Sequence, residues 1–190
     1  MKQAEQLDPI SFYIQVHIGW LHYYSGHYDQ AIDRYQKVLE MESNYSWARM
    51  HLSLAYEQKG MYSEAIAELQ QAQASSTLSH RYLALLARIY AVSGKRQEAQ
   101  KLLTELLAME KERYVSPYNL ALIYSGLNDK GRAIEWLRKG LDQRAGRMVR
   151  LQMDPRFNTL RSEPEFEKIL LRINSSSPPV GPVTLAGNPR

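Results

Sequence analysis

The sequence contains no cysteine, which excludes disulfides, thiolate metal sites and a cysteine nucleophile. It has no stretch of about 18 uninterrupted apolar residues, and its opening, MKQAEQLDPI, has no apolar signal core. The net charge is +4, but no run of lysines or arginines resembles a nucleic-acid-binding arm. From these absences we expect a cytoplasmic protein that does not insert into a membrane and does not have nucleic acid as a main partner.

What the sequence does have is a period of 34 residues, kept by several columns of side chains. One column is always alanine, namely Ala31, Ala65, Ala99 and Ala133. A second column is always small, namely Gly19, Ser53, Ala87 and Ala121. Small, large and aromatic residues fixed at such a period predict stacked helix–turn–helix units, which usually bind other macromolecules.

Each unit is predicted to contain two amphipathic helices joined by a short turn at Gly26, Gly60 and Gly94. The first helices are expected near 11–24, 46–58 and 80–92 and from Pro117, and the second near 29–41, 62–74, 96–109 and 129–143. The two small columns indicate where the helices of one unit cross closely. The fold class is therefore all-α, a right-handed helical solenoid of about four helix–turn–helix units.

These columns resemble those of the tetratricopeptide repeat (TPR) over about residues 12 to 143. The implied organisation is TPR 1 at 11–45, TPR 2 at 46–79, TPR 3 at 80–113 and TPR 4 at 114–144. Pro9 lies one period before Ser43, where a repeat-closing proline would stand, so residues 1–10 are interpreted as the remnant of a preceding TPR helix. A short helical N-cap that keeps the register is the alternative. The chain departs from the family pattern at Ser43, Thr77 and Lys111, where the closing proline is absent.

After the fourth unit, an amphipathic helix is expected to begin near Pro164, with Phe166, Ile169, Leu170 and Ile173 on one face. This amphipathic pattern predicts a C-terminal helical cap at 145–173, followed by a tail at 174–190 with the composition of a disordered segment.

The cap also resembles the ending of the C-terminal TPR region of bacterial regulators. In such proteins the TPR array follows a winged-helix, Ser/Thr kinase or cyclase domain. The matching residues are Asp154, Pro155, Phe157, Leu160, Arg161, Pro164 and Phe166.

In a TPR array the first helix of each unit lines the concave face, so the register predicts a partner-binding groove. The candidate residues are Tyr13, Val16, His17, Trp20, Tyr24, Trp47, Met50, His51, Leu54, Arg81, Arg88, Tyr118 and Asn119. The aromatic side chains of the first two units suit the apolar anchors of a peptide, although core packing is an alternative explanation. The lysines and asparagines of the TPR clamp for chaperone tails are missing, so acidic chaperone tails are not expected as ligands.

Motifs that carry chemistry are also missing from the sequence. There is no P-loop, Rossmann glycine pattern, GxSxG or HExxH, and no isolated pair of carboxylates suggests acid–base catalysis. His17 and His51 occupy equivalent positions in successive units, but no third ligand accompanies them, so no metal site is expected. We therefore expect no enzyme activity, no catalytic residues, no cofactor and no small-molecule substrate.

The leading hypothesis is a non-enzymatic scaffold for protein–protein interaction, which binds a partner peptide or domain through the concave groove. The alternative is a sensory, regulatory or oligomerisation segment of a larger bacterial signalling or transcription-regulator protein. Self-association would then use the exposed edge of the N-terminal repeat.

Overall fold

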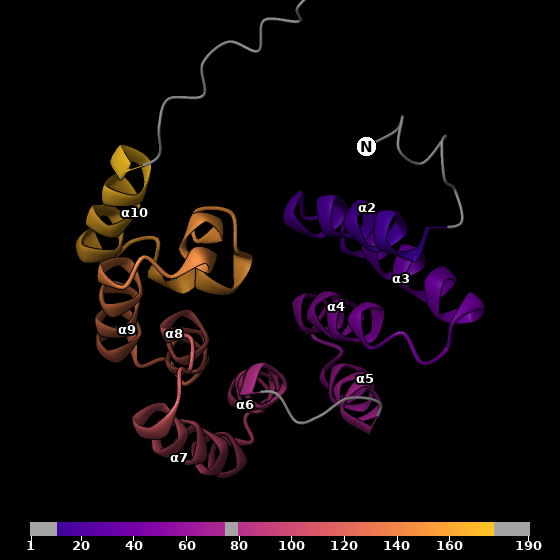
Figure 1. The fold of residues 1–190 in the computed structure, drawn as a ribbon, viewed down its shortest axis with the longest axis horizontal. Coiled ribbons are helices and arrows are strands. Elements are labelled where there is room, and N and C mark those ends of the chain that lie inside the picture. Colours follow the sequence, from indigo (N-terminus) through magenta and orange to yellow (C-terminus); the bar gives the residue numbers. More distant parts are fainter. Residues whose placement is uncertain (1–10, 75–79, 177–190) are drawn as a thin grey trace, which may run out of the picture.

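The computed structural model describes residues 11–74 and 80–176, and every regular element within these ranges is helical (Figure 1). The paired helices are α2 (Phe12–Tyr24) and α3 (Tyr28–Met41), α4 (Ser46–Gln58) and α5 (Tyr62–Ala74), α6 (His80–Val92) and α7 (Arg96–Glu112), and α8 (Pro117–Gly126) and α9 (Lys130–Asp142). Two 3-10 helices, η1 (Gly146–Arg150) and η2 (Pro155–Leu160), and the helix α10 (Pro164–Ser176) follow. The expected all-α solenoid is confirmed.

The helix bounds follow the periodicity closely. Helices α4, α5 and α6 begin and end at the predicted residues, whereas α7 continues beyond 109 to Glu112. Asp129 caps α9, because its Oδ1 accepts a hydrogen bond from the backbone N–H of Arg132 at 3.1 Å. The interpretation of residues 1–10 as a helix remnant lies outside the described residues. The predicted tail at 174–190 also lies outside them from residue 177 on, whereas its first three residues belong to α10.

The turn glycines adopt the left-handed conformation that their repetition predicted. Gly26, Gly60 and Gly94 have φ angles of 78°, 74° and 83°, and Asn128 takes the same place in the fourth unit with φ 61°. Glycine tolerates this conformation because it has no Cβ, and asparagine tolerates it better than most other residues.

The small-residue columns lie where the helices of a unit cross. A Cβ atom added at Gly19 in α2 would come within 2.4 Å of Cε1 of Tyr35 in α3. Tyr35 is fully buried, as are all four residues of the alanine column. The close approach of the two helices therefore depends on a missing side chain on one helix and a large aromatic ring on the other.

The helix pairs stack in sequence order, so that the chain forms a curved solenoid (Figure 1). Its apolar interior comprises two clusters of buried residues, one spanning α2 to α6 and the other spanning α6 to α10. Helix α6 contributes to both clusters, and it therefore joins the two halves of the stack.

The C-terminal cap occupies the place of a fifth unit. Helix α10 starts and ends one 34-residue period after α9, and η2 overlaps the residues one period after α8. The first helix of this unit is replaced by 3-10 turns, because Pro155 has no backbone N–H and disfavours helical geometry at Asp154, whose ψ is 113°. Phe157, Leu160 and Phe166 are fully buried, as a cap of the stack requires.

The crossing at Gly19 yields a prediction about stability. We expect Gly19→Ala to lower the free energy of unfolding by about 1–3 kcal/mol, because the new methyl group must displace the Tyr35 ring from a packed site. Urea denaturation followed by circular dichroism measures the change. Gly131→Ala in α9 is the control, since its Cβ would meet nothing closer than 3.9 Å, and it should stabilise the helix. Equal stability of Gly19→Ala and wild type would contradict the assigned crossing.

Candidate partner-binding face

The segment between α9 and α10 lies on the concave side of the solenoid. In Figure 1 the orange part of the chain that carries η1 and η2 lies inside the curve and faces α2. The guanidinium carbon of Arg150 in η1 lies 4.0 Å from the centroid of the Trp20 ring in α2. The C-terminal segment thus covers part of the surface that the repeat register assigns to a groove.

The structure divides the thirteen predicted groove residues by exposure. Those that are buried are Val16, Met50, His51, Leu54, Arg88, Tyr118 and Asn119. Those that are partly buried are His17, Trp20, Tyr24 and Arg81. Tyr13 and Trp47 are exposed, with 61% and 37% of their surface accessible. The accessible part of the predicted groove is therefore much smaller than the register suggests.

Four of the predicted groove residues form one continuous group of rings, the aromatic strip, made of Tyr13, His17, Trp20 and Trp47. Tyr13 and His17 are one helical turn apart in α2, and their ring centroids are 4.0 Å apart. The His17 ring lies 5.2 Å from Trp20 and 6.4 Å from Trp47 of α4. The strip thus joins the first helices of two successive units.

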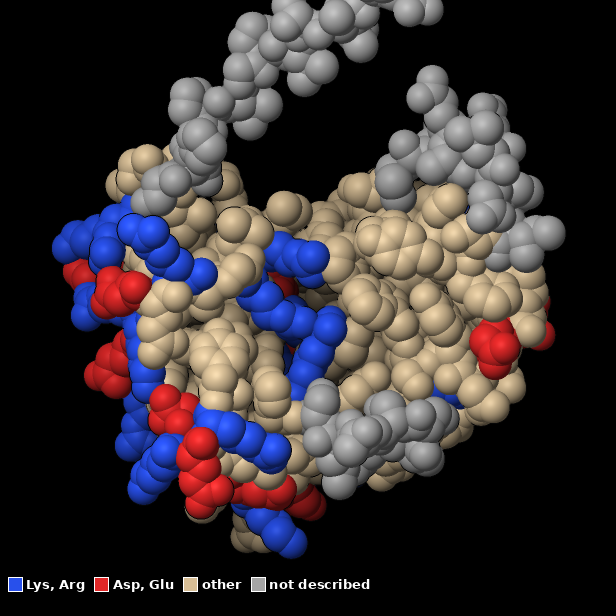
Figure 2. Space-filling view, in the orientation of Figure 1, with Lys and Arg blue, Asp and Glu red and all other residues tan. Residues whose placement is uncertain are grey.

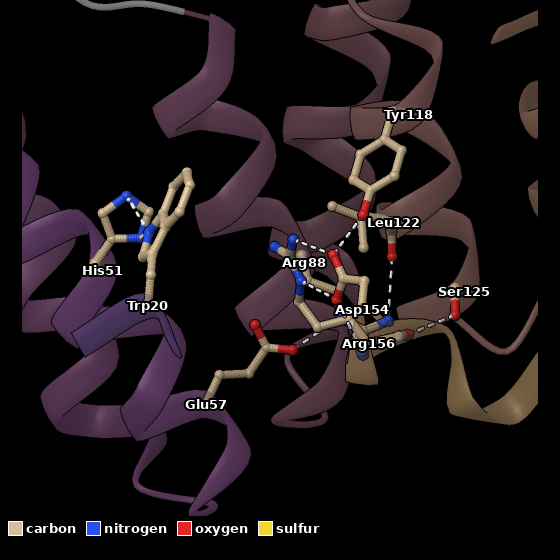
Figure 3. Close-up of polar contacts among 9 residues, drawn as sticks. All are labelled: Trp20, His51, Glu57, Arg88, Tyr118, Leu122, Ser125, Asp154 and Arg156. Carbon is tan, nitrogen blue, oxygen red and sulfur yellow. Dashed lines mark hydrogen bonds and ion pairs between the residues drawn. The ribbon is translucent and has the colours of Figure 1, made fainter. Parts of the chain in front are cut away.

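His51 lies beneath the strip and accepts a hydrogen bond from Trp20, whose Nε1 is 2.6 Å from His51 Nδ1 and 2.9 Å from Nε2 (Figure 3). Burial lowers the pKa of His51 well below its usual value, and the nearby positive charge of Arg81 lowers it further. His51 is therefore neutral at pH 7 and able to accept this proton. It supports the tryptophan and is not part of the accessible surface.

A second buried contact joins the units below the concave face. Arg88 of α6 donates from Nε to Glu57 Oε1 of α4 at 3.0 Å and from Nη1 to the Leu122 carbonyl of α8 at 3.1 Å (Figure 3). Both charged side chains are buried. Arg88, predicted as a groove residue, is thus buried and connects three units.

The C-terminal segment is fixed by a third buried group. Arg156 donates to Asp154 from Nη2 at 2.5 Å and from Nε at 2.9 Å, and the Tyr118 hydroxyl donates to Asp154 Oδ2 at 2.5 Å (Figure 3). Burial alone would raise the pKa of Asp154, but the charge of Arg156 and the hydrogen bonds from Arg156 and Tyr118 outweigh it and hold the pKa below its usual value. The carboxylate is therefore charged and joins α8 to the segment before η2.

Three further arginines gather at the centre of the concave face, and we call them the arginine cluster: Arg81, Arg147 and Arg150. Figure 2 shows basic side chains in this central hollow. Among the described residues, no carboxylate forms an ion pair with any of the three. Burial lowers the pKa of Arg81 to about 9, with a further contribution from Arg147. Sequence reasoning found Arg81 but missed Arg147 and Arg150, because neither belongs to a repeating column.

Within the described ranges, no group of three or more histidine, aspartate or glutamate side chains is placed to hold a metal ion. In the same ranges, no helix is both long enough and apolar enough to cross a bilayer. His51, which the repeat register placed in the position equivalent to His17, accepts a hydrogen bond from Trp20.

These features define a class of protein, the helical repeat solenoids that present a concave surface formed by successive first helices. Models of one family, described as the tetratricopeptide repeat, match residues 22–89, 83–113 and 118–145. Together the matches extend over more than half of the chain, which therefore belongs to the TPR family.

Solved structures agree with this fold. YrrB, described as a TPR protein with an unusual peptide-binding site, is 13% identical with a TM-score of 0.51, over 92% of this chain and 90% of YrrB. A structure of nearly identical TPR-like repeats from Podosopora anserina is 20% identical with a TM-score of 0.51, over 88% of this chain and 95% of that one. A search of curated protein sequences finds no match. At these identities the likeness concerns the fold alone.

The buried Asp154 yields a prediction about stability and its pH dependence. We expect Asp154→Asn to lower the free energy of unfolding by about 3–5 kcal/mol at pH 7, because it leaves Arg156 buried and unpaired. A carboxylate with a lowered pKa stabilises the fold above its unfolded pKa and loses that effect in acid. The difference in free energy of unfolding between wild type and Asp154→Asn should therefore become smaller as the pH falls below 3.8.

Urea denaturation at several pH values measures both effects. Asp142→Asn is the control, because it removes an exposed ion pair with Arg172 and should change stability by less than about 1 kcal/mol. Similar losses in free energy of unfolding for the two variants would show that the buried Asp154 ion pair stabilises the fold no more than an exposed ion pair does.

The buried His51 predicts a second pH dependence, near neutrality. Its pKa is lowered in the folded state, so below pH 6.5 the unfolded chain binds a proton at His51 that the folded chain does not bind. We expect the free energy of unfolding to fall by at most about 1.4 kcal/mol for each pH unit below 6.5. His51→Gln keeps an acceptor for Trp20 and should flatten the profile between pH 7.5 and 5, measured by thermal unfolding. An unchanged slope in this variant would assign the effect to other groups.

Proposed function

We propose that the protein is a non-enzymatic scaffold of the cytoplasm that binds a partner peptide or protein domain on its concave face. The observation that carries this proposal is the aromatic strip, in which Tyr13 and Trp47 are exposed and Trp47 lies beside Arg81 of the arginine cluster. Tyrosine, tryptophan and arginine are the residue types enriched among the dominant contacts of protein interfaces. An exposed cluster of this composition is typical of an interaction site.

The geometry of the strip favours an extended segment of a partner. Its rings follow one another from Tyr13 in α2 to Trp47 in α4, in the direction in which the units stack. Arg81 of α6 continues this line, with its guanidinium 5.9 Å from the Trp47 ring. A peptide lying across these three helices would find apolar anchors at one end and cationic groups at the other. Peptide binding by a protein of the same fold, YrrB, supports the proposal.

The test begins with a displayed library of random peptides selected on the full chain. Affinities of the selected peptides are then measured by fluorescence polarisation for wild type and variants. We expect Trp47→Ala and Tyr13→Ala each to weaken binding by about 2 kcal/mol or more if they are dominant contacts, while circular dichroism stays unchanged. Leu171→Ala is the matched control, because Leu171 in α10 is as exposed as Tyr13 but lies outside the strip. Undiminished affinity in both strip variants would refute the proposal.

A second candidate function is a sensory, regulatory or oligomerisation segment of a larger bacterial regulator. The observation that favours it is Leu21 of α2, an exposed leucine on the first described helix of the array. Such a position suits contact between the N-terminal edges of two chains. If this function holds, the protein should be dimeric in analytical ultracentrifugation and Leu21→Glu should be monomeric. A monomeric wild type would argue against it.

A further inference from the structure

We propose that Arg81, Arg147 and Arg150 form a binding site for an oxyanion, a carboxylate or phosphate group of the partner. The inference rests on the proposed function, because it assigns the chemistry of the group that a partner would place beside the aromatic strip. Two of the three arginines come from η1 and only one from a repeat helix. The site therefore belongs to the contact between the array and its C-terminal segment.

The arginine cluster has room for a ligand. A hollow of about 330 Å³ is lined by Arg81 and Arg147 together with the polar groups of His80, Ser116 and Asn119. A second hollow, of about 190 Å³, is lined by Arg81, Arg147 and Arg150 and by the indoles of Trp20 and Trp47. One water molecule needs roughly 10–15 Å³ when measured in this way, so either hollow can hold an anionic group of several atoms.

The charges around these hollows are unbalanced. Arg156 joins the three arginines of the cluster in lining a third, smaller hollow, and the buried carboxylates of this region are Glu57 and Asp154. Both carboxylates are engaged, the first by Arg88 and the second by Arg156. The positive charge of the arginine cluster therefore has no counter-charge among the described residues, and like charges in a partly buried site repel strongly.

Buried polar atoms without partners point to the same site. The Nε of Arg81 and one terminal nitrogen of Arg156 are each buried without a hydrogen-bond acceptor. Arg156 is more than nine-tenths buried and lines a small hollow together with Arg81, Arg147 and Arg150. Buried donors without acceptors are unfavourable, and an oxyanion would supply acceptors and charge together. Guanidinium groups suit this task because they pair with carboxylate and phosphate oxygens in a bidentate manner.

The site also contains its own optical reporters. The Arg150 guanidinium lies over Trp20 at 4.0 Å, and that of Arg81 lies over Trp47 at 5.9 Å. An anion that draws either guanidinium away from its ring should change the tryptophan emission. The third tryptophan, Trp136, lies beside Lys139 in α9 and outside both hollows, so it provides a constant background.

The experiment titrates the full chain with inorganic phosphate and, separately, with succinate, at constant ionic strength set with sodium chloride. Tryptophan emission and melting temperature are both recorded. For wild type we expect a saturable emission change and a rise in melting temperature with at least one of the two anions. Arg81→Gln and Arg147→Gln should each weaken binding at least tenfold, and Arg81→Lys should weaken it less than Arg81→Gln.

The matched control is Arg132→Gln, because Arg132 also lies over an aromatic ring, that of Tyr124 at 5.6 Å, but outside the hollows. It should bind the anions as wild type does. Since Arg81 and Arg147 make no ion pair in the described structure, both variants are expected to fold, and each tests the site independently of the other.

The outcomes separate the sources of the anion. A response to phosphate alone assigns the site to a phosphoryl group, a response to succinate alone assigns it to a carboxylate, and a response to both supports a general oxyanion site. No saturable response to either anion, or an equal response in wild type, Arg81→Gln and Arg147→Gln, would overturn the inference. If peptides still bound in a Trp47-dependent manner, the proposed function would stand without the anion site.

Discussion

The buried ion pair between Asp154 and Arg156 determines which residues are accessible on the concave face of this protein. It holds the residues after α9 inside the curve of the solenoid, where Tyr118 also donates a hydrogen bond to the carboxylate. From that anchor, η1 places Arg147 and Arg150 opposite the first two units, and Arg150 covers Trp20. Leu54 of α4 lines a hollow together with Arg147 and Arg150, so the C-terminal segment also lies against the first helix of the second unit. With the pair in place, the accessible surface is a short aromatic strip beside a cationic hollow.

The period of the sequence was sufficient to predict the repeat helices but not the C-terminal segment. Columns such as Gly19 with Ser53 and Ala31 with Ala65 reflect close packing between neighbours, so they fix helix positions and crossings. The path of residues 145–153 follows no column, and its direction depends on Asp154, a charged residue at a site that is leucine in the fourth unit. A hydrophobic pattern indicates which side of a helix is apolar, but not whether solvent or another segment of the chain covers it.

Side-chain pairs between successive units repeat with a spacing of their own. Trp20 with His51, Glu57 with Arg88, and Ser125 with the carbonyl of Arg156 are each 31 residues apart. This spacing is three residues shorter than the period, so each side chain reaches almost one helical turn back along the equivalent helix of the next unit. The same offset occurs in the Trp20–His51 hydrogen bond, in the Glu57–Arg88 ion pair and in the hydrogen bond from Ser125 to a backbone carbonyl. It is thus a property of the way the units stack, and each position uses it with different chemistry.

Contact between Arg150 and Trp20 changes how the array should fold. In an open solenoid each unit touches only its neighbours, so the ends can fray independently and folding can begin anywhere. Here Arg150, which follows the last repeat, packs on the first described helix, and loop closure over most of the chain must precede that contact. Loss of order at one end therefore removes packing from the other. The array should behave less like a chain of separable units and more like a closed domain with one cooperative transition.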